Sequence, residues 1–168
     1  MILPKQKILQ LINSDTPLIE GFIDLKTQLQ PASFDLTLKK VFKLKDGGRL
    51  DFTNEERYIP KKDEVEFKGE WVELEKGCYI VMYNEIVRIP LNLMMIVRPR
   101  SSLLRMGASL HASLWDPGYY GRSVSLLIVH SENGIKLKRN ARIAQAVFLQ
   151  LSEETTDSYQ GIYKGENV

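Results

Sequence analysis

The sequence predicts an all-β fold, a jelly-roll-like barrel or sandwich that follows one short N-terminal helix. Two observations lead to this prediction. Short apolar segments recur along most of the chain, and Gly, Pro, Asn or Asp separates most of them. Only one modest segment has a helical pattern. Many short strands at this spacing are typical of sandwiches and barrels rather than of a parallel α/β sheet.

The predicted elements follow one another in a simple order. The helix is expected at residues 5–13, where four apolar residues can face one side. The first strand is expected from Phe34 to Leu44, because apolar residues hold even positions and Asp35, Thr37 and lysines lie between them. Such period-two alternation is typical of a half-buried strand. Further strands are expected at residues 71–74, 79–83, 86–89, 94–97, 109–114, 124–129 and 146–151.

The composition is that of one ordinary globular domain. The chain has 168 residues, enough to bury a sizeable core, and 43% of them are hydrophobic. The 23 basic and 21 acidic residues are interspersed and leave a net charge of +2, which argues against a nucleic acid polymer as partner. A small anionic ligand such as a triphosphate stays possible.

Cysteine usage and hydropathy exclude other classes. Cys78 is the only cysteine, so we expect no disulfide framework and no thiolate metal cluster, and we expect Cys78 itself to be a small buried residue. No apolar run approaches the roughly 20 residues of a membrane span, and no signal peptide is visible. We therefore expect no membrane association and, by default, a cytoplasmic location.

A basic segment from Arg98 to Gly107 is the first candidate binding site. It carries three arginines and two serines directly after an apolar strand. Arginine forks match phosphate oxygens, and serine hydroxyls with free backbone N–H groups can complete an anion site. Ordinary solvated turns have the same composition, so both interpretations stay open.

Two later segments are weaker candidates. Trp115 to Gly121 contains an Asp-Pro-Gly turn, which is either a hairpin tip with aromatic residues or a carboxylate held beside a stacking ring. Arg139 to Gln145 leads into an apolar strand, and Gln145 could be an amide fixed at the start of that strand. Neither segment identifies a function by itself.

Taken in order, these segments resemble the motifs of the trimeric dUTPase and dCTP deaminase superfamily, in the form of archaeal-type dUTPases of the dCTP deaminase-like branch. The resemblance runs from about Ile2 to Gly161. It involves a first motif at residues 30–36, a second at 100–103, a third at 116–121, a fourth at 141–145 and the start of a C-terminal motif at 159–161.

The resemblance implies an assembly and a cofactor. It implies a homotrimer of jelly-roll-like subunits with active sites between them, and Mg²⁺ that bridges a bound deoxyribonucleoside triphosphate. Residues 1–152 would form a single dUTPase-like β domain. Residues 153–168 would form a mobile C-terminal tail that closes over the active site.

The resemblance also implies roles for single residues. Asp116 would be the catalytic base, and Asp35 would act on the metal through its water shell. Tyr119 would pack on the deoxyribose, Ser113 and Leu114 would contact sugar or base, and Tyr159 and Lys164 would act from the tail. The phosphates would be bound by Arg100, Ser101, Ser102, Arg105 and Gln145.

The superfamily performs two reactions, and two positions decide between them. Hydrolysis of dUTP needs a carboxylate that orients water for attack on the α-phosphorus, and Asp116 occupies that place. Deamination needs a glutamate five residues beyond Gly121, where this chain has Leu126. A leucine cannot transfer a proton. Two histidines and one cysteine also cannot supply the ligands of a zinc deaminase.

We therefore predict a dUTP diphosphatase that produces dUMP and pyrophosphate and cleans the nucleotide pool. A dCTP deaminase, alone or bifunctional, and a non-enzymatic nucleotide-binding regulator are the alternatives. The segment from His111 to Asp116 is two residues shorter than in deaminases, which alters the hairpin that recognises the base. His111 itself is expected to be a hydrogen-bonded strand histidine.

Overall fold

The structure is a computed structural model that describes residues 1–168, and it confirms a mostly β fold. The helices are α1 (Lys5–Ile12), α2 (Leu25–Gln28) and α3 (Ser101–Arg105). The strands are β1 (Ile19–Glu20), β2 (Phe34–Leu44), β3 (Lys62–Glu64), β4 (Trp71–Leu74), β5 (Gly77–Tyr83), β6 (Ile86–Arg88), β7 (Leu93–Pro99), β8 (Ala108–His111), β9 (Tyr120–Gly121), β10 (Val124–Val129), β11 (Ile135–Lys138) and β12 (Arg142–Gln150).

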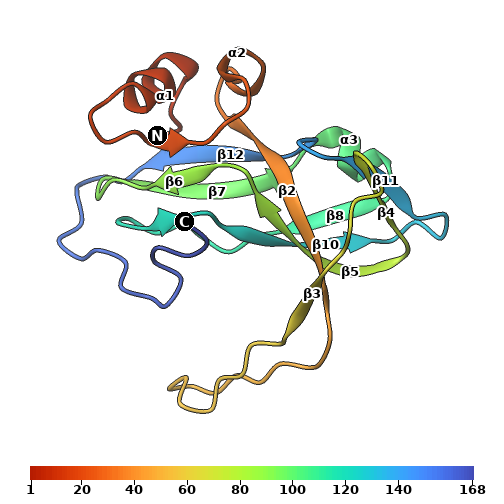
Figure 1. The fold of residues 1–168 in the computed structure, drawn as a ribbon. Coiled ribbons are helices and arrows are strands. Elements are labelled where there is room, and N and C mark those ends of the chain that lie inside the picture. The colour runs from red at the N-terminus through yellow and green to blue at the C-terminus, as the bar shows by residue number, and fades with distance from the viewer.

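One antiparallel sheet forms most of the molecule (Figure 1). Its strand order is β7-β12-β2-β5-β10-β8, and β3 pairs with the far end of β2. The chain beyond β8 returns to β7, where Trp115 and Met95 exchange two backbone hydrogen bonds of 3.0 Å. The sheet therefore nearly closes into a barrel. Two small sheets, β1-β6-β9 and β11-β4, flank it.

A single hydrophobic cluster fills this barrel. Its 33 buried residues run from Leu3 to Phe148, so the first helix and the last strand pack on the same core. Helix α1 contributes Ile8 and Ile12 from its apolar face, as the sequence pattern predicts. Phe34, Trp115 and Phe148 are among the largest fully buried side chains, and burial of such rings contributes strongly to stability.

Strand β2 differs from the half-buried strand that the alternation predicts. Asp35 and Thr37 are as buried as their apolar neighbours. Polar side chains from other segments cover them: Arg100, Arg142 and Gln145 contact Asp35, and Glu85 contacts Thr37. The strand also changes partner, because its first half pairs with β12 and from Leu38 onward it pairs with β5. A register shift between Leu38 and Lys40 marks the change and moves the buried position to Val41.

Other differences concern element ends. The basic segment after β7 is not only a turn, because residues Ser101–Arg105 form helix α3. Strand β12 begins at Arg142, so Gln145 lies inside the strand rather than at its start. Strands β1, β3, β9 and β11, of two to four residues each, were not predicted. Cys78 is exposed, and the expectation of a buried cysteine is wrong.

Two segments leave the barrel (Figure 1). The chain between β2 and β3 extends as a long arm, on which Phe52 is fully exposed. Residues after β12 form no further helix or strand and run back along the barrel to the hairpin that carries β9. None of the helices has the length and apolar character needed to cross a membrane.

Candidate functional site

A buried carboxylate, Asp35, organises the predicted phosphate-binding residues. Its side chain has no exposed surface. Asp35 Oδ2 lies 3.2 Å from Arg100 Nε and 3.2 Å from an Arg142 guanidinium nitrogen. Gln145, the cross-strand partner of Asp35 on β12, donates from Nε2 to Oδ1 at 3.4 Å. Four residues from β2, β12 and the end of β7 thus share one centre.

The electrostatics of this centre fit an anion site. Burial raises the pKa of Asp35 above its ordinary value, and the charges of Arg100 and Arg142 limit that rise. Two guanidinium groups share one carboxylate, so the centre keeps one excess positive charge. Both arginines are about 30% exposed, which leaves donors free for a ligand.

Helix α3 presents the second group of predicted residues. Arg100 precedes the helix in an extended conformation, and its backbone N–H donates to Ile143 of β12 at 3.0 Å. Ser101 and Ser102 are exposed in the first turn of the helix. Arg105 is also exposed and reaches back to the Ser101 carbonyl oxygen at 3.3 Å. These three residues adjoin the Asp35 centre through Arg100.

Arg142 is a site residue to which the sequence argument gave no role. Besides Asp35, it binds the carbonyl oxygen of Thr27 in helix α2 at 3.0 Å. The signal was present, because Arg142 lies in the segment that resembles the fourth motif. Its contact with Asp35 depends on the pairing of β2 with β12, which no local pattern reveals.

The hairpin with Asp116 lies elsewhere on the subunit. Asp116-Pro117-Gly118 forms the predicted turn, with Gly118 at a φ of +81°, a value that favours glycine. Asp116 is exposed, and its carbonyl oxygen accepts from Tyr119 N at 3.1 Å. Ser113 and Leu114 are exposed just before it. Its carboxylate makes no ion pair or hydrogen bond within the chain.

The C-terminal tail packs on the hairpin that carries Asp116 in the same chain. Tyr159 N donates to Pro117 O at 2.8 Å, and the ring of Tyr159 meets that of Tyr119 edge to face at 5.8 Å. Tyr119 Oη donates to a Glu166 carboxylate oxygen at 2.9 Å. As a result Tyr119 is only 4% exposed. Lys164 stays exposed and contacts Ser158 at 3.3 Å.

Acidic pH is expected to strengthen this docking of the tail. Burial raises the pKa of Glu166 above its ordinary value of 4.5, so docking favours the protonated carboxyl. The corresponding stabilisation is complete below the ordinary pKa and is lost as the pH rises through the raised one. Amide resonances of Gly161 and Gly165, followed by NMR between pH 4 and 8, should report more docked tail in acid. Glu166→Gln should remove this dependence, and an unchanged profile in the variant would assign it to another group.

The single chain does not bring Asp116 to the phosphate-binding residues. The hairpin is fixed at Met95, whereas Arg100 follows the opposite end of β7. Five strand residues separate these points by roughly 17 Å. Helix α3 and strand β9 accordingly lie at opposite ends of the barrel in Figure 1. The phosphate-binding candidates and the catalytic candidate therefore occupy two separate surfaces of the chain.

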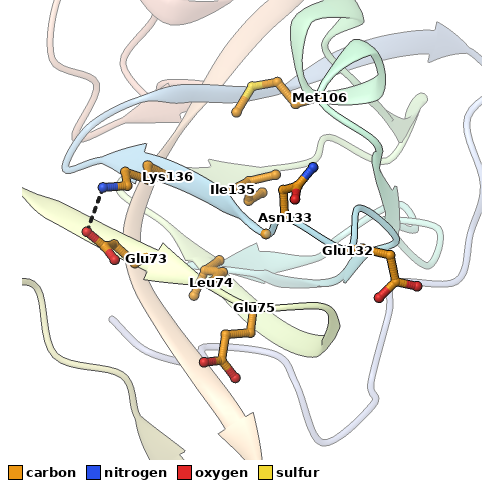
Figure 2. A pocket seen from close by; sticks show the side chains of 9 residues that line it. Glu73, Leu74, Glu75, Met106, Glu132, Asn133, Ile135 and Lys136 are labelled. Carbon is orange, nitrogen blue, oxygen red and sulfur yellow. Dashed lines mark ion pairs between the residues drawn. The ribbon is translucent and has the colours of Figure 1, made fainter.

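Two further features lie outside both surfaces. His111 ends β8 and, as expected, is a hydrogen-bonded strand histidine, 3.2 Å from Ser109 Oγ. The open pocket in Figure 2 is formed by β4, β11 and the adjoining loops, and Glu73 pairs there with Lys136 at 2.8 Å. None of the predicted site residues lines that pocket.

Comparison with known proteins identifies similar chains. A family model described as dCTP deaminase-like matches residues 2–151. A relative from Methanosarcina mazei is 45% identical over 168 residues, covering 99% of this chain and 98% of the relative, and is named probable deoxyuridine 5′-triphosphate nucleotidohydrolase. A relative from Archaeoglobus fulgidus with the same name is 47% identical over 167 residues, covering 99% and 98% of the two chains.

A solved structure shares the fold. The 2′-deoxycytidine 5′-triphosphate deaminase from Agrobacterium tumefaciens superimposes with a TM-score of 0.65 at 24% sequence identity. The match covers 88% of this chain and 47% of that one, so this chain spans about half its length. The likeness concerns the arrangement of strands.

Proposed function

This chain belongs to the dCTP deaminase-like family, and from this premise we propose that it hydrolyses dUTP to dUMP and pyrophosphate. One observation carries the proposal: the residue needed for hydrolysis is present in the hairpin, and the residue needed for deamination is absent from β10. Asp116 offers a free, exposed carboxylate, while Leu126 of β10 stands opposite His111 where a deaminase needs its glutamate. Relatives that match nearly the whole chain carry the name of this activity.

The proposed reaction is attack of water on the α-phosphorus. Asp116 would accept a proton from this water, since its exposed carboxylate is free of other partners in the chain. Arg100, Arg105, Ser101, Ser102 and Gln145 would hold the phosphates, and the arginines would stabilise the charge that develops on the leaving pyrophosphate. Removal of dUTP from the nucleotide pool, in the cytoplasm, stays the predicted role.

The residues present fit a magnesium ion that is carried by the substrate. No group of three His, Cys, Asp or Glu side chains converges on a metal position. Mg²⁺ commonly keeps several waters and binds through substrate phosphates with one or two carboxylates. When bound, it would supply positive charge that neutralises the phosphates, and Asp35 would hold it through its water shell.

Asp35 is the proposed contact to the metal's water shell. In the free chain its oxygens are enclosed by Arg100, Arg142 and Gln145. We propose that Asp35 orders these arginines for the triphosphate and that its carboxylate would contact the metal's water shell.

We further propose that the active site forms between the subunits of a homotrimer. The separation of Asp116 from Arg100 within one chain supports this, because one triphosphate must meet both surfaces. Tyr119 would pack on the deoxyribose, with Ser113 and Leu114 beside sugar or base. Since Tyr119 lies under its own tail here, the tail must leave it before Tyr159 and Lys164 can close over a bound nucleotide.

One assay tests the proposed function. Purified protein is incubated with Mg²⁺ and either dUTP or dCTP, and pyrophosphate and ammonia are measured separately. We expect one pyrophosphate per dUTP consumed and no ammonia from dCTP. Ammonia from dCTP would instead establish a deaminase. Absence of both products, with binding of a non-hydrolysable dUTP analogue intact, would establish a nucleotide-binding regulator.

A further inference from the structure

Glu85, between β5 and β6, is a buried carboxylate that the proposed reaction does not use. Only 1% of its surface is exposed, and it is one of two buried carboxylates, the other being Asp35. Asp35 is paired with two arginines, whereas Glu85 contacts no cation. Burial raises the pKa of Glu85, and hydrogen bonds from Thr37 and Gln28 act against that rise. Burial of a carboxylate without a cation destabilises the folded state unless hydrogen bonds compensate for the lost water. The hydrogen bonds of Glu85 are therefore the feature to explain.

The hydrogen bonds of Glu85 all lead to the strand that bears Asp35. Its Oε2 accepts from the backbone N–H of Thr37 at 2.9 Å. Its Oε1 accepts from the Thr37 hydroxyl at 2.6 Å and from Gln28 Nε2 at 2.7 Å. Gln28 Nε2 also donates to the carbonyl oxygen of Asp35 at 2.8 Å. Glu85 thus contacts Thr37 directly and Asp35 through one amide.

The position of Thr37 explains the need for such an acceptor. At this residue β2 leaves β12 and begins to pair with β5, and both ladders are irregular there. A buried backbone N–H without a partner loses its hydrogen bond to water and gains nothing in exchange, which destabilises the fold. The Glu85 carboxylate takes the place of the missing strand partner at the point where β2 changes from β12 to β5.

Helix α2 connects the same network to the arginines. Gln28 Oε1 accepts from the backbone N–H groups of Ile23 and Asp24, at 2.7 and 3.0 Å, which holds the start of this helix. The Thr27 carbonyl oxygen accepts from Arg142, the partner of Asp35. Displacement of Gln28 would therefore move both the carboxylate and an arginine of the proposed phosphate site.

We propose that Glu85 is a positioning residue for triphosphate binding, which holds Asp35 and Arg142 in place through Thr37 and Gln28. This inference rests on the proposed function, since it assigns a role within the same site. Glu85 touches neither substrate nor reacting atoms. It holds in place two residues, Asp35 and Arg142, at the centre of the proposed phosphate site.

The variant Glu85→Gln tests the proposal with little change of volume. The glutamine amide can accept with one oxygen only, and its NH₂ group faces either the Thr37 N–H or the donors at Oε1. At least one of the groups that donate to Glu85 must then lose its acceptor. We expect the segment that carries this donor, β2 or Gln28, to shift. A displacement of about 1 Å at a binding site can cost about a hundredfold in rate. We expect about tenfold weaker binding of α,β-imido-dUTP and a fall in kcat of about ten- to a hundredfold.

Comparison with dUMP separates positioning from a structural role. Calorimetry well below the unfolding temperature should show weaker binding of the imido-triphosphate by Glu85→Gln and unchanged binding of dUMP, which lacks the β- and γ-phosphates. Thr37→Val, which removes one of the three donors, should have an intermediate effect. Equal losses for both nucleotides, or none for either, would overturn the proposal.

Tyr83→Phe is the matched control. Tyr83 lies on β5 two residues before Glu85, is equally buried, and its hydroxyl donates to Ser125 Oγ at 2.7 Å. Its removal should lower the unfolding temperature about as much as Glu85→Gln does, while the difference in affinity between the two nucleotides stays that of the wild type. A loss of triphosphate affinity in Tyr83→Phe would show that destabilisation alone causes the effect.

The wild-type protein keeps the two proposals distinguishable. If it binds the imido-triphosphate but produces no dUMP, the proposed reaction fails while the positioning test can still be run on binding. If it cleaves dUTP and Glu85→Gln retains full triphosphate affinity, the reaction stands and the positioning role is wrong.

Discussion

Replacement of Asp116 by asparagine should lower kcat for dUTP by about two to four powers of ten and leave nucleotide binding nearly unchanged. The amide has the size of the carboxylate but cannot take a proton from water. Because the Asp116 side chain is exposed and makes no contact that supports the turn, the hairpin should keep its shape. Single-turnover kinetics with dUTP and calorimetry with the imido analogue measure the two quantities.

Asp15→Asn is the control for this experiment. Asp15 is also an exposed aspartate in a loop, and it lies outside both candidate surfaces. Its replacement removes the same charge and should leave kcat within a factor of two or so of the wild type. Near-normal turnover in Asp116→Asn would mean that another group, or the solvent, accepts the proton.

Loss of Asp35 should produce the largest change in stability. Asp35→Ala leaves Arg100 and Arg142 side by side without their shared counterion, and removal of one partner of a buried pair typically costs about 3–5 kcal/mol. We expect about 3 kcal/mol, since both arginines are partly solvated. For a chain of this length, that corresponds to a fall in unfolding temperature of roughly 6–12 °C. Denaturant titration at fixed protein concentration gives the free energy of unfolding.

Glu70→Ala provides the comparison for Asp35→Ala. Glu70 forms an ion pair with Lys138 at 2.7 Å in which both side chains are about half exposed or more. Exposed pairs contribute about 0–1 kcal/mol, so this variant should lie close to the wild type. If the two variants were destabilised equally, the ion pairs of Asp35 with Arg100 and Arg142 would contribute no more to stability than an exposed pair.

The sequence predicted those elements whose formation depends on residues close together in the chain. The apolar face of α1, the Asp-Pro-Gly turn and most long strands follow from periodicity and turn residues, and the structure contains them. The motif order also identified the segments that supply Arg100, Gln145 and Asp116. Each of these segments alone has the composition of an ordinary turn or loop, and they became candidates because together, in order, they resemble the motifs of one family.

Features that depend on strand pairing were not visible in this way. Nothing near Asp35 in sequence shows that Arg142, 107 residues away, shares its carboxylate. Glu85 follows Asn84 between two predicted strands and has the composition of an ordinary exposed turn. Its burial and its hydrogen bonds to Thr37 arise only when these distant segments pack together. The alternation of β2 failed for a related reason, because side chains from other segments cover Asp35 and Thr37 on the face that was expected to be exposed.

The place of β12 has a consequence for how the chain folds. This last strand lies between β7 and β2 and bonds to both. During synthesis, one edge of β2 and one edge of β7 therefore stay unpaired until residues near 150 have left the ribosome. Unpaired strand edges can form hydrogen bonds with other chains and so promote aggregation. Folding that depends on such distant pairings is slow, on the order of milliseconds to seconds. The nascent chain should thus be most prone to aggregation just before its final strand emerges.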